Sequence, residues 1–98
     1  MIMIRSIVRP EKTDAVLAAL MEAGFPAVTK VGVVGRGKQR GIKIGDITYD
    51  EIPKEMLITV VPETKVDALL AGLRPLLDAS SGVLFLTETF VSRPEYFT

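Results

Sequence analysis

Residues 7–20 read IVRPEKTDAVLAAL and residues 60–73 read VVPETKVDALLAGL, so one pattern occurs twice, 53 positions apart. Each copy has a β-branched run, then a Pro-Glu pair, then apolar residues at helical spacing. Proline suits the first turn of a helix, because the N–H that it lacks would have no helical partner there. The pattern therefore predicts a strand followed by a helix in each half of the chain.

Two further strands complete the two halves. The expected strands cover residues 2–8, 27–34, 56–61 and 83–90. Gly24 is a natural stop for the first helix, and Pro75 should end or kink the second. The order β-α-β, repeated, predicts an α+β fold of the ferredoxin-like class, with a double βαβ unit, an antiparallel four-stranded sheet and a single domain over residues 1–98.

Both faces of this sheet are expected to be apolar. In the first strand Ile2, Ile4 and Val8 fall on one face and Ile7 on the other. The two helices can cover only one of these faces. A small domain with an uncovered apolar face is expected to self-associate.

Composition excludes several function classes. Lys and Arg number 12 against 12 Asp and Glu, so no net charge favours nucleic acid as a partner. The chain has no His and no Cys, which removes soft-metal sites and the common nucleophilic mechanisms, and no catalytic constellation is recognisable. Without such a constellation, we expect that the protein is not an enzyme. No apolar run is long enough to span a bilayer, so we expect a cytoplasmic protein without membrane insertion.

The segment between the second and third strands is unusual in composition. Residues 35–54 contain four glycines and five Lys or Arg residues, with the stretch GRGKQRG at 35–41. Glycines let the backbone approach a ligand closely, and cations favour phosphate or carboxylate. A flexible, solvated hairpin would have the same composition, so the pattern leaves an anion site and a plain loop both open.

Four stretches together resemble one family. They are IRSIVRPEK at residues 4–12, GRGKQRG at 35–41, EIPK at 51–54 and VVP at 60–62. They resemble the PII nitrogen regulatory signal-transduction family, with its nitrogenase-associated branch most similar, and the match is continuous over roughly residues 1–73. In that family a long T-loop, here residues 36–54, joins strands two and three.

The resemblance implies a homotrimer that binds ATP or ADP between subunits. It further implies Mg²⁺ and 2-oxoglutarate as effectors, and control of a target protein such as nitrogenase through the T-loop. By position, the nucleotide-binding residues would be Thr29, Gly35, Gly37, Gly82 and Arg93. The 2-oxoglutarate residues would be Gln39, Gly41 and Lys54, with Gln39 also the Mg²⁺ ligand.

The last quarter of the chain departs from the family pattern. The family's second nucleotide element ends in a lysine where this chain has Val83, and only Gly82 matches clearly. Tyr49 stands four residues before Pro53, not six as the modified tyrosine of some branches does, so modification is not carried over to it. An alternative therefore stays open: a CutA-like or divergent PII-like trimer that does not bind ATP and serves as a structural module or binds another effector.

Overall fold

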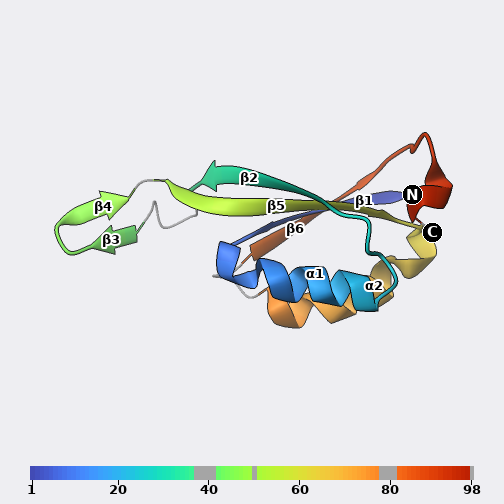
Figure 1. Ribbon diagram of the computed structural model, residues 1–98, viewed down its shortest axis with the longest axis horizontal. Helices are drawn as coiled ribbons and strands as arrows, with labels where there is room; N and C mark the ends of the chain where they lie inside the picture. Colours follow the sequence, from blue (N-terminus) through green and yellow to red (C-terminus); the bar gives the residue numbers. More distant parts are fainter. Residues whose placement is uncertain (37–41, 50, 78–81, 98) are drawn as a thin grey trace.

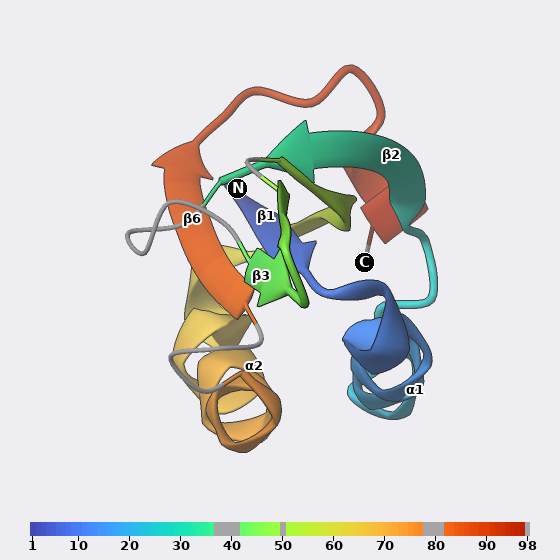
Figure 2. The same cartoon turned by 90° about the vertical axis from the view of Figure 1, so that its left-hand side faces the viewer.

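The computed structural model describes residues 1–36, 42–49, 51–77 and 82–97. Four strands form the main sheet in the order β2-β5-β1-β6, and all neighbours are antiparallel. The strands are β1 (Ile2–Val8), β2 (Thr29–Gly35), β5 (Ile52–Val61) and β6 (Gly82–Glu88). Helices α1 (Thr13–Glu22) and α2 (Val66–Leu73) lie side by side on one face of this sheet (Figures 1 and 2). This arrangement confirms the expected ferredoxin-like α+β fold.

The repeat noted in the sequence sets the core. Val16 and Leu20 of α1 and, 53 positions later, Leu69 and Leu73 of α2 are all buried. They pack with the helix-facing side chains of the central strands, which are Ile4, Val8, Leu57 and Val61. Burial of equivalent positions in both halves explains why the two helices cover the same face.

The ends of the helices follow local chemistry. A short 3₁₀ turn opens each helix, Pro10–Lys12 before α1 and Glu63–Lys65 before α2. Gly24 has a φ of 94°, the N–H of Phe25 donates to the carbonyl of Leu20 at 2.8 Å, and that of Gly24 donates to Met21 at 3.0 Å. This is the Schellman arrangement, which needs a left-handed residue that glycine supplies at little cost. The predicted stop at Gly24 is confirmed.

Two boundaries differ from the sequence prediction. The third strand of the sheet, β5, begins at Ile52 and not at residue 56, and β2 runs from Thr29 to Gly35 and not over 27–34. The two strands pair as far as Gly35 opposite Ile52. Beyond Glu55, β5 has no β1 partner, so Pro53 stands where one side of the strand is unpaired and its missing N–H is tolerated. Pairing with β2 thus places residues 52–55 in a strand, although their local composition predicts a loop.

A small hairpin lies beyond the sheet. Strands β3 (Ile42–Ile44) and β4 (Ile47–Tyr49) pair across the turn at Gly45-Asp46, where Gly45 has a φ of 61°. The hairpin forms one end of a molecule that measures 51 × 25 × 19 Å (Figure 1). The two termini lie at the other end. In the part of the predicted T-loop that the structure describes, most residues therefore belong to strands.

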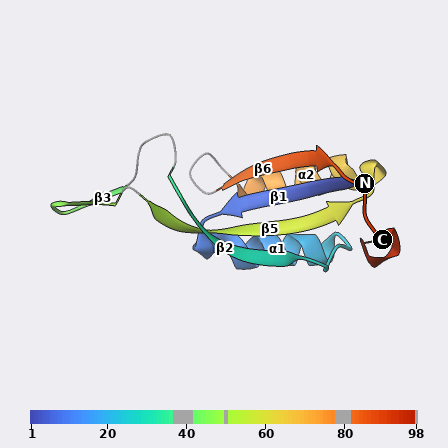
Figure 3. The same ribbon diagram turned by 90° about the horizontal axis from the view of Figure 1, so that it is seen from above.

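Among the described residues, no helix or strand forms a layer on the face of the sheet away from the helices. Figure 3 views the molecule with this open face toward the reader. Because side chains alternate along each strand, the register assigns to the open face Met3, Arg5, Ile7, Thr29, Val31, Val33, Gly35, Lys54, Met56, Ile58, Val60, Val83, Phe85 and Thr87. Val31, Val83 and Phe85 are 38%, 48% and 49% exposed, so the face is apolar and largely uncovered.

The chain forms a 3₁₀ turn after α2 and another after β6. After α2 a 3₁₀ turn, Arg74–Leu76, follows directly, and it contains Pro75, as expected for the helix stop. After β6 the chain crosses to a 3₁₀ turn at Pro94–Phe97, which lies beside the end of β5. The N–H of Thr89 donates to the carbonyl of Met1 at 3.1 Å, which ties the start of this crossing to the start of β1.

Candidate functional site

The point where the ribbon leaves the body of the molecule is the strongest candidate site. Here β1 ends at Val8, opposite Glu55, while β2 and β5 continue as a two-stranded ribbon. We call Val33–Gly35 together with Ile52–Lys54 the ribbon base. In Figure 1 this part of β2 and β5 extends beyond the ends of the helices.

The structure brings two of the predicted ligand residues together at the ribbon base. Lys54 pairs with Val33, and a Cβ placed on Gly35 would lie 3.8 Å from Cδ of Lys54. The lysine stem therefore runs along the strand next to a residue that has no side chain. Lys54 is half-buried as a whole residue, and a lysine ammonium beside a residue without a side chain is suited to bind a carboxylate or phosphate.

A second cation lies close to Lys54 in the backbone trace. Arg9 follows Val8, the last residue of β1, and Lys54 directly precedes Glu55, the partner of Val8. The two cationic residues thus occupy neighbouring positions at the same end of the sheet. The sequence analysis did not select Arg9 as a ligand residue, although its place directly after the first strand was a usable signal.

The other predicted nucleotide residues are spread over the chain. Thr29 is on the open face at the start of β2, six residues before Gly35, which corresponds to about 20 Å of extended strand. Gly82 begins β6 at the far edge of the sheet, opposite Val8 and toward the helices. Arg93 lies in the C-terminal crossing, with its Cζ 5.3 Å from the centre of the Tyr96 ring. One copy of the chain does not gather these residues around a single ligand.

Gly82 has a packing role in this fold. A Cβ on it would stand 2.9 Å from Cδ2 of Leu77, 3.0 Å from the carbonyl oxygen of Ile7 and 3.1 Å from Cγ1 of Val8. Only a residue without a side chain fits there without movement of neighbours. Packing against the sheet and the segment after α2 thus favours glycine at this position, which also matched the family pattern.

Part of the predicted site is not covered by the structure. Gly37, Gln39 and Gly41 lie outside the described residues, and so does the side chain of Tyr49. Within the described ranges, no three acidic, His or Cys residues cluster in a way that could hold a metal ion. The predicted Mg²⁺ ligand, Gln39, therefore stays a prediction.

A polar cluster lies directly behind the ribbon base, on the helix side of the sheet. The hydroxyl of Thr13 donates to Oε1 of Glu55 at 2.7 Å, and Nζ of Lys30 lies 3.7 Å from Oε2 of the same carboxylate. Thr13 is 3% exposed, whereas the Lys30 side chain is 54% exposed. The cluster joins α1, β2 and β5, and nothing in the sequence pattern pointed to it.

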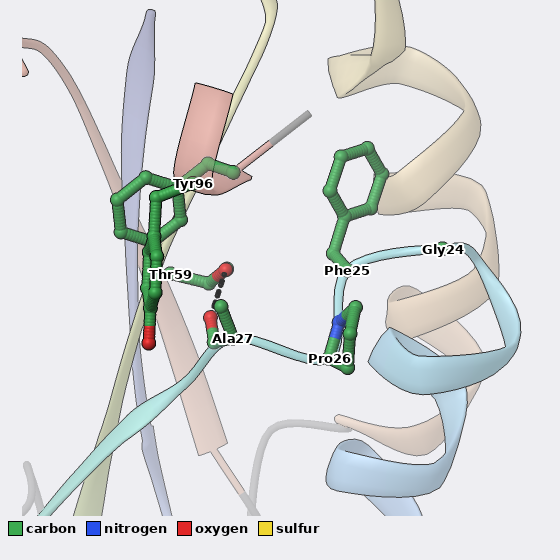
Figure 4. Close-up of a pocket in the computed structure, with 7 residues that line it drawn as sticks. Gly24, Phe25, Pro26, Ala27, Thr59 and Tyr96 are labelled. Atoms are coloured by element: carbon green, nitrogen blue, oxygen red, sulfur yellow. Dashed lines mark hydrogen bonds between the residues drawn. The ribbon is translucent and has the colours of Figure 1, made fainter. Parts of the chain in front are cut away.

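A small pocket lies at the opposite end of the sheet. It encloses about 220 Å³ between the turn after α1 and the last 3₁₀ turn, and is lined by Gly24, Phe25, Pro26, Ala27, Thr59, Tyr96 and Phe97 (Figure 4). The hydroxyl of Thr59 donates to the carbonyl of Ala27 at 3.0 Å, so the buried polar atom in its wall is already paired. The pocket is below the usual 300–1,000 Å³ range of ligand sites.

Comparison with known proteins identifies the family. The model of the nitrogen regulatory protein P-II family matches residues 1–96. The chain belongs to the P-II family. The match spans both halves of the fold, including β6 and the C-terminal crossing, where the sequence motifs were weakest.

Among P-II relatives, three archaeal proteins illustrate the branch. Nitrogen fixation nifHD region GlnB-like protein 1 of Methanothermobacter marburgensis is 53% identical over 68 residues, 69% of this chain, and its counterpart in Methanobacterium ivanovii is 50% identical over the same length. The Methanothermococcus thermolithotrophicus protein of that name is 46% identical over 80 residues, 82% of this chain and 74% of its own length. Within the P-II family, the chain is thus similar to GlnB-like proteins named for the nifHD region, which confirms the branch expected from the motifs.

The matches cover only part of the relatives' length. The matched part of the chain spans 65% of the length of the M. marburgensis and M. ivanovii relatives.

None of the helices in the described ranges combines the length and the apolar content that a bilayer crossing requires.

Proposed function

We propose that this P-II protein senses 2-oxoglutarate together with adenine nucleotide and controls a target protein through residues 36–54. The observation that carries the proposal is the placement of Lys54 next to Gly35, with Cδ of Lys54 3.8 Å from the point where a Cβ on Gly35 would stand, where the ribbon leaves the sheet. A ligand bound there touches both strands of the ribbon. If the ligand binds one conformation of the loop more tightly than another, its binding increases the population of that conformation. Ligand binding is therefore coupled to the direction and order of the loop.

The chemistry of the ribbon base suits a dicarboxylate. Lys54 offers an ammonium to one carboxylate, and Arg9, which follows the last residue of β1, adds a second cationic group at the same end. The other carboxylate and the keto oxygen of 2-oxoglutarate are hard donors for Mg²⁺, which favours oxygen ligands. Gln39 and the nucleotide phosphates would supply the remaining oxygen ligands.

We further propose that the nucleotide binds between copies of the chain. Thr29, Gly82 and Arg93 lie at different ends and edges of one subunit, so one copy alone cannot surround ATP or ADP. Residues from two neighbouring copies would complete the site. This requirement supports the homotrimer implied by the family resemblance.

The charge pattern of the open face supports a cyclic assembly over a face-to-face pair. Arg5 lies in the middle of this face, between Ile58 and Phe85, and Lys54 is its second charged member. No carboxylate belongs to the face among the described residues. Two open faces packed against each other would bury like charges, which is costly. A ring in which each open face meets a different surface of the next copy avoids this.

The regulated target is proposed from the relatives' names. The similar archaeal proteins are named for the nitrogen fixation nifHD region. We therefore propose a nitrogenase component as the partner of residues 36–54. The proposal includes no nucleic acid partner, no membrane insertion and no chemical reaction carried out by the chain itself.

Titration calorimetry tests the effector proposal directly. ATP is titrated first, and 2-oxoglutarate is then titrated in the presence of Mg-ATP. Binding of 2-oxoglutarate that depends on Mg-ATP is the expected result. A folded oligomer that gives no heat with either compound would refute it.

A second candidate function is favoured by one observation. Val83 stands where the family has its phosphate-contacting lysine, and it is an exposed apolar residue of the open face, opposite Ile7. Together with the packing role of Gly82, this supports the CutA-like or divergent PII-like trimer that does not bind ATP. In that case the ribbon would still meet a partner, but ATP would give no heat.

A further inference from the structure

The cluster behind the ribbon base connects three elements through one carboxylate. Glu55 lies on β5, accepts a hydrogen bond from Thr13 at 2.7 Å, and has Nζ of Lys30 at 3.7 Å. Thr13 is the first residue of α1, and Lys30 belongs to β2. One side chain thus joins both strands of the ribbon to the helix layer.

The internal repeat shows that this polar cluster is not required by the fold. The position related to Glu55 by the shift of 53 is Ile2, and the position related to Thr13 is Val66. Both are partly buried apolar residues packed against the core. The half of the molecule without a ribbon therefore fills the equivalent place with hydrocarbon, and only the half from which the ribbon extends has the carboxylate.

The position of Glu55 in β5 explains how the cluster can affect Lys54. It is opposite Val8, the last residue of β1 that pairs with β5. The next residue outward, Lys54, points to the open face beside Gly35 because side chains alternate along a strand. When Glu55 is held in place, the adjacent backbone of β5 is held as well. The position and direction of the Lys54 side chain are therefore set.

We propose that Glu55, Thr13 and Lys30 form a latch that holds the ribbon base to the helix layer, which makes Glu55 a positioning residue for Lys54. With the latch closed, the ribbon leaves the body in one direction and the ammonium of Lys54 has one position. With the latch open, no side chain ties β5 at Glu55 to the helix layer, so the direction of the ribbon and the position of Lys54 vary. The ligand part of this proposal rests on the proposed function, whereas the mechanical part does not.

The test replaces the latch by the apolar pair of the other half. The double variant Thr13→Val with Glu55→Ile copies Val66 and Ile2, so it keeps an apolar contact and should fold. Hydrogen exchange is measured at the amides of residues 33–35, 52 and 54–58, and 2-oxoglutarate affinity is measured with Mg-ATP present. Thr13→Ser is the conservative control, because it keeps the hydroxyl that donates to Glu55.

The double variant should exchange faster in the ribbon base, by about tenfold, while the core strand β1 exchanges as in the wild type. Its dissociation constant for 2-oxoglutarate should rise about three- to tenfold, and Thr13→Ser should match the wild type in both measurements. Wild-type exchange at the ribbon base in the double variant would overturn the proposal. If that variant does not fold, Thr13→Val alone is compared with Thr13→Ser, and equal exchange in the two would overturn it likewise.

The two proposals fail in different ways. A wild-type protein that does not bind 2-oxoglutarate refutes the proposed function, and the exchange rates still decide the latch. A wild-type protein that binds 2-oxoglutarate, with affinity and exchange both unchanged in the double variant, refutes the latch and leaves the proposed function standing.

Discussion

Cδ2 of Leu77 lies 2.9 Å from the point where a Cβ on Gly82 would stand. This closeness joins the segment after α2 to the start of β6, at the edge of the sheet where Val8 is the partner of Gly82. The carbonyl of Ile7 closes the same space from the backbone, and a backbone atom cannot move aside as a side chain can. The position therefore admits glycine for a steric reason that does not depend on any ligand.

The first prediction concerns this glycine. Gly82→Ala should destabilise the protein by about 1–3 kcal/mol, the usual cost of overpacking, whether or not nucleotide is present. Chemical unfolding at fixed protein concentration measures it. The matched control is Gly72→Ala in α2, where a Cβ meets nothing within 4 Å and alanine should stabilise the helix by about 0.5–1 kcal/mol. Loss of nucleotide affinity in Gly82→Ala without loss of stability would contradict the packing role.

The second prediction concerns Lys54. Lys54→Gln should weaken 2-oxoglutarate binding about ten- to a hundredfold, because a charge-assisted hydrogen bond contributes about 1.5–3 kcal/mol. Calorimetry in the presence of Mg-ATP measures the loss. Lys65→Gln is the control, since Lys65 is an exposed cation in the turn before α2, which follows the end of β5 opposite to the ribbon. Equal affinities in the two variants would remove Lys54 from the site.

The third prediction restores a charge. Val83→Lys should raise ATP affinity several-fold, because it returns a cation to the family's phosphate-contacting position, while ADP should gain less. The side chain is 48% exposed on the open face, so the substitution should not disturb the core. Titration of both nucleotides against wild type and variant measures the difference. An unchanged ATP affinity would show that the second nucleotide element is not used in this chain.

The fourth prediction concerns assembly. Ile58→Asp, on the open face between Thr29 and Arg5, should prevent the homotrimer, because a carboxylate would have to be buried at the subunit contact. Light scattering measures the mass. Met21→Asp is the control: Met21 is 66% exposed on α1, on the other side of the molecule, so its variant should keep the wild-type mass. A trimer that persists in Ile58→Asp would mean that the open face is not the interface.

The fold was predictable because the information that specifies it is local and repeated. Helical spacing selected eight apolar residues, which are Val16, Leu17, Leu20, Met21, Val66, Leu69, Leu70 and Leu73. Val16, Leu20, Leu69 and Leu73 are buried, whereas Met21 is 66% exposed, so the spacing gave the buried face of each helix but not its limits. Gly24 and Pro75 marked the helix ends by chemistry that acts within a single turn. The early start of β5 at Ile52 was missed because it depends on a strand partner 17 residues away in the chain, at Gly35.

The site was only partly predictable. The proximity of Gly35 and Lys54 agrees with roles that the family resemblance gave to both residues. The hydrogen bond between Thr13 and Glu55 joins residues 42 positions apart, and no periodicity in either segment signals it. Gly82 matched a ligand motif, but only the three-dimensional packing reveals the steric reason for a glycine at that position.

The hairpin at the far end of the molecule makes loop movement measurable by distance. Both termini lie at the opposite end, and the long axis is 51 Å (Figure 1). The chain has no cysteine, so Asp46→Cys in the hairpin turn would provide the single thiol for a probe. A second label at the N-terminal amine then places a donor–acceptor pair along the long axis. Effector-driven rearrangement of the ribbon would be read as a change in energy transfer, without any knowledge of the target.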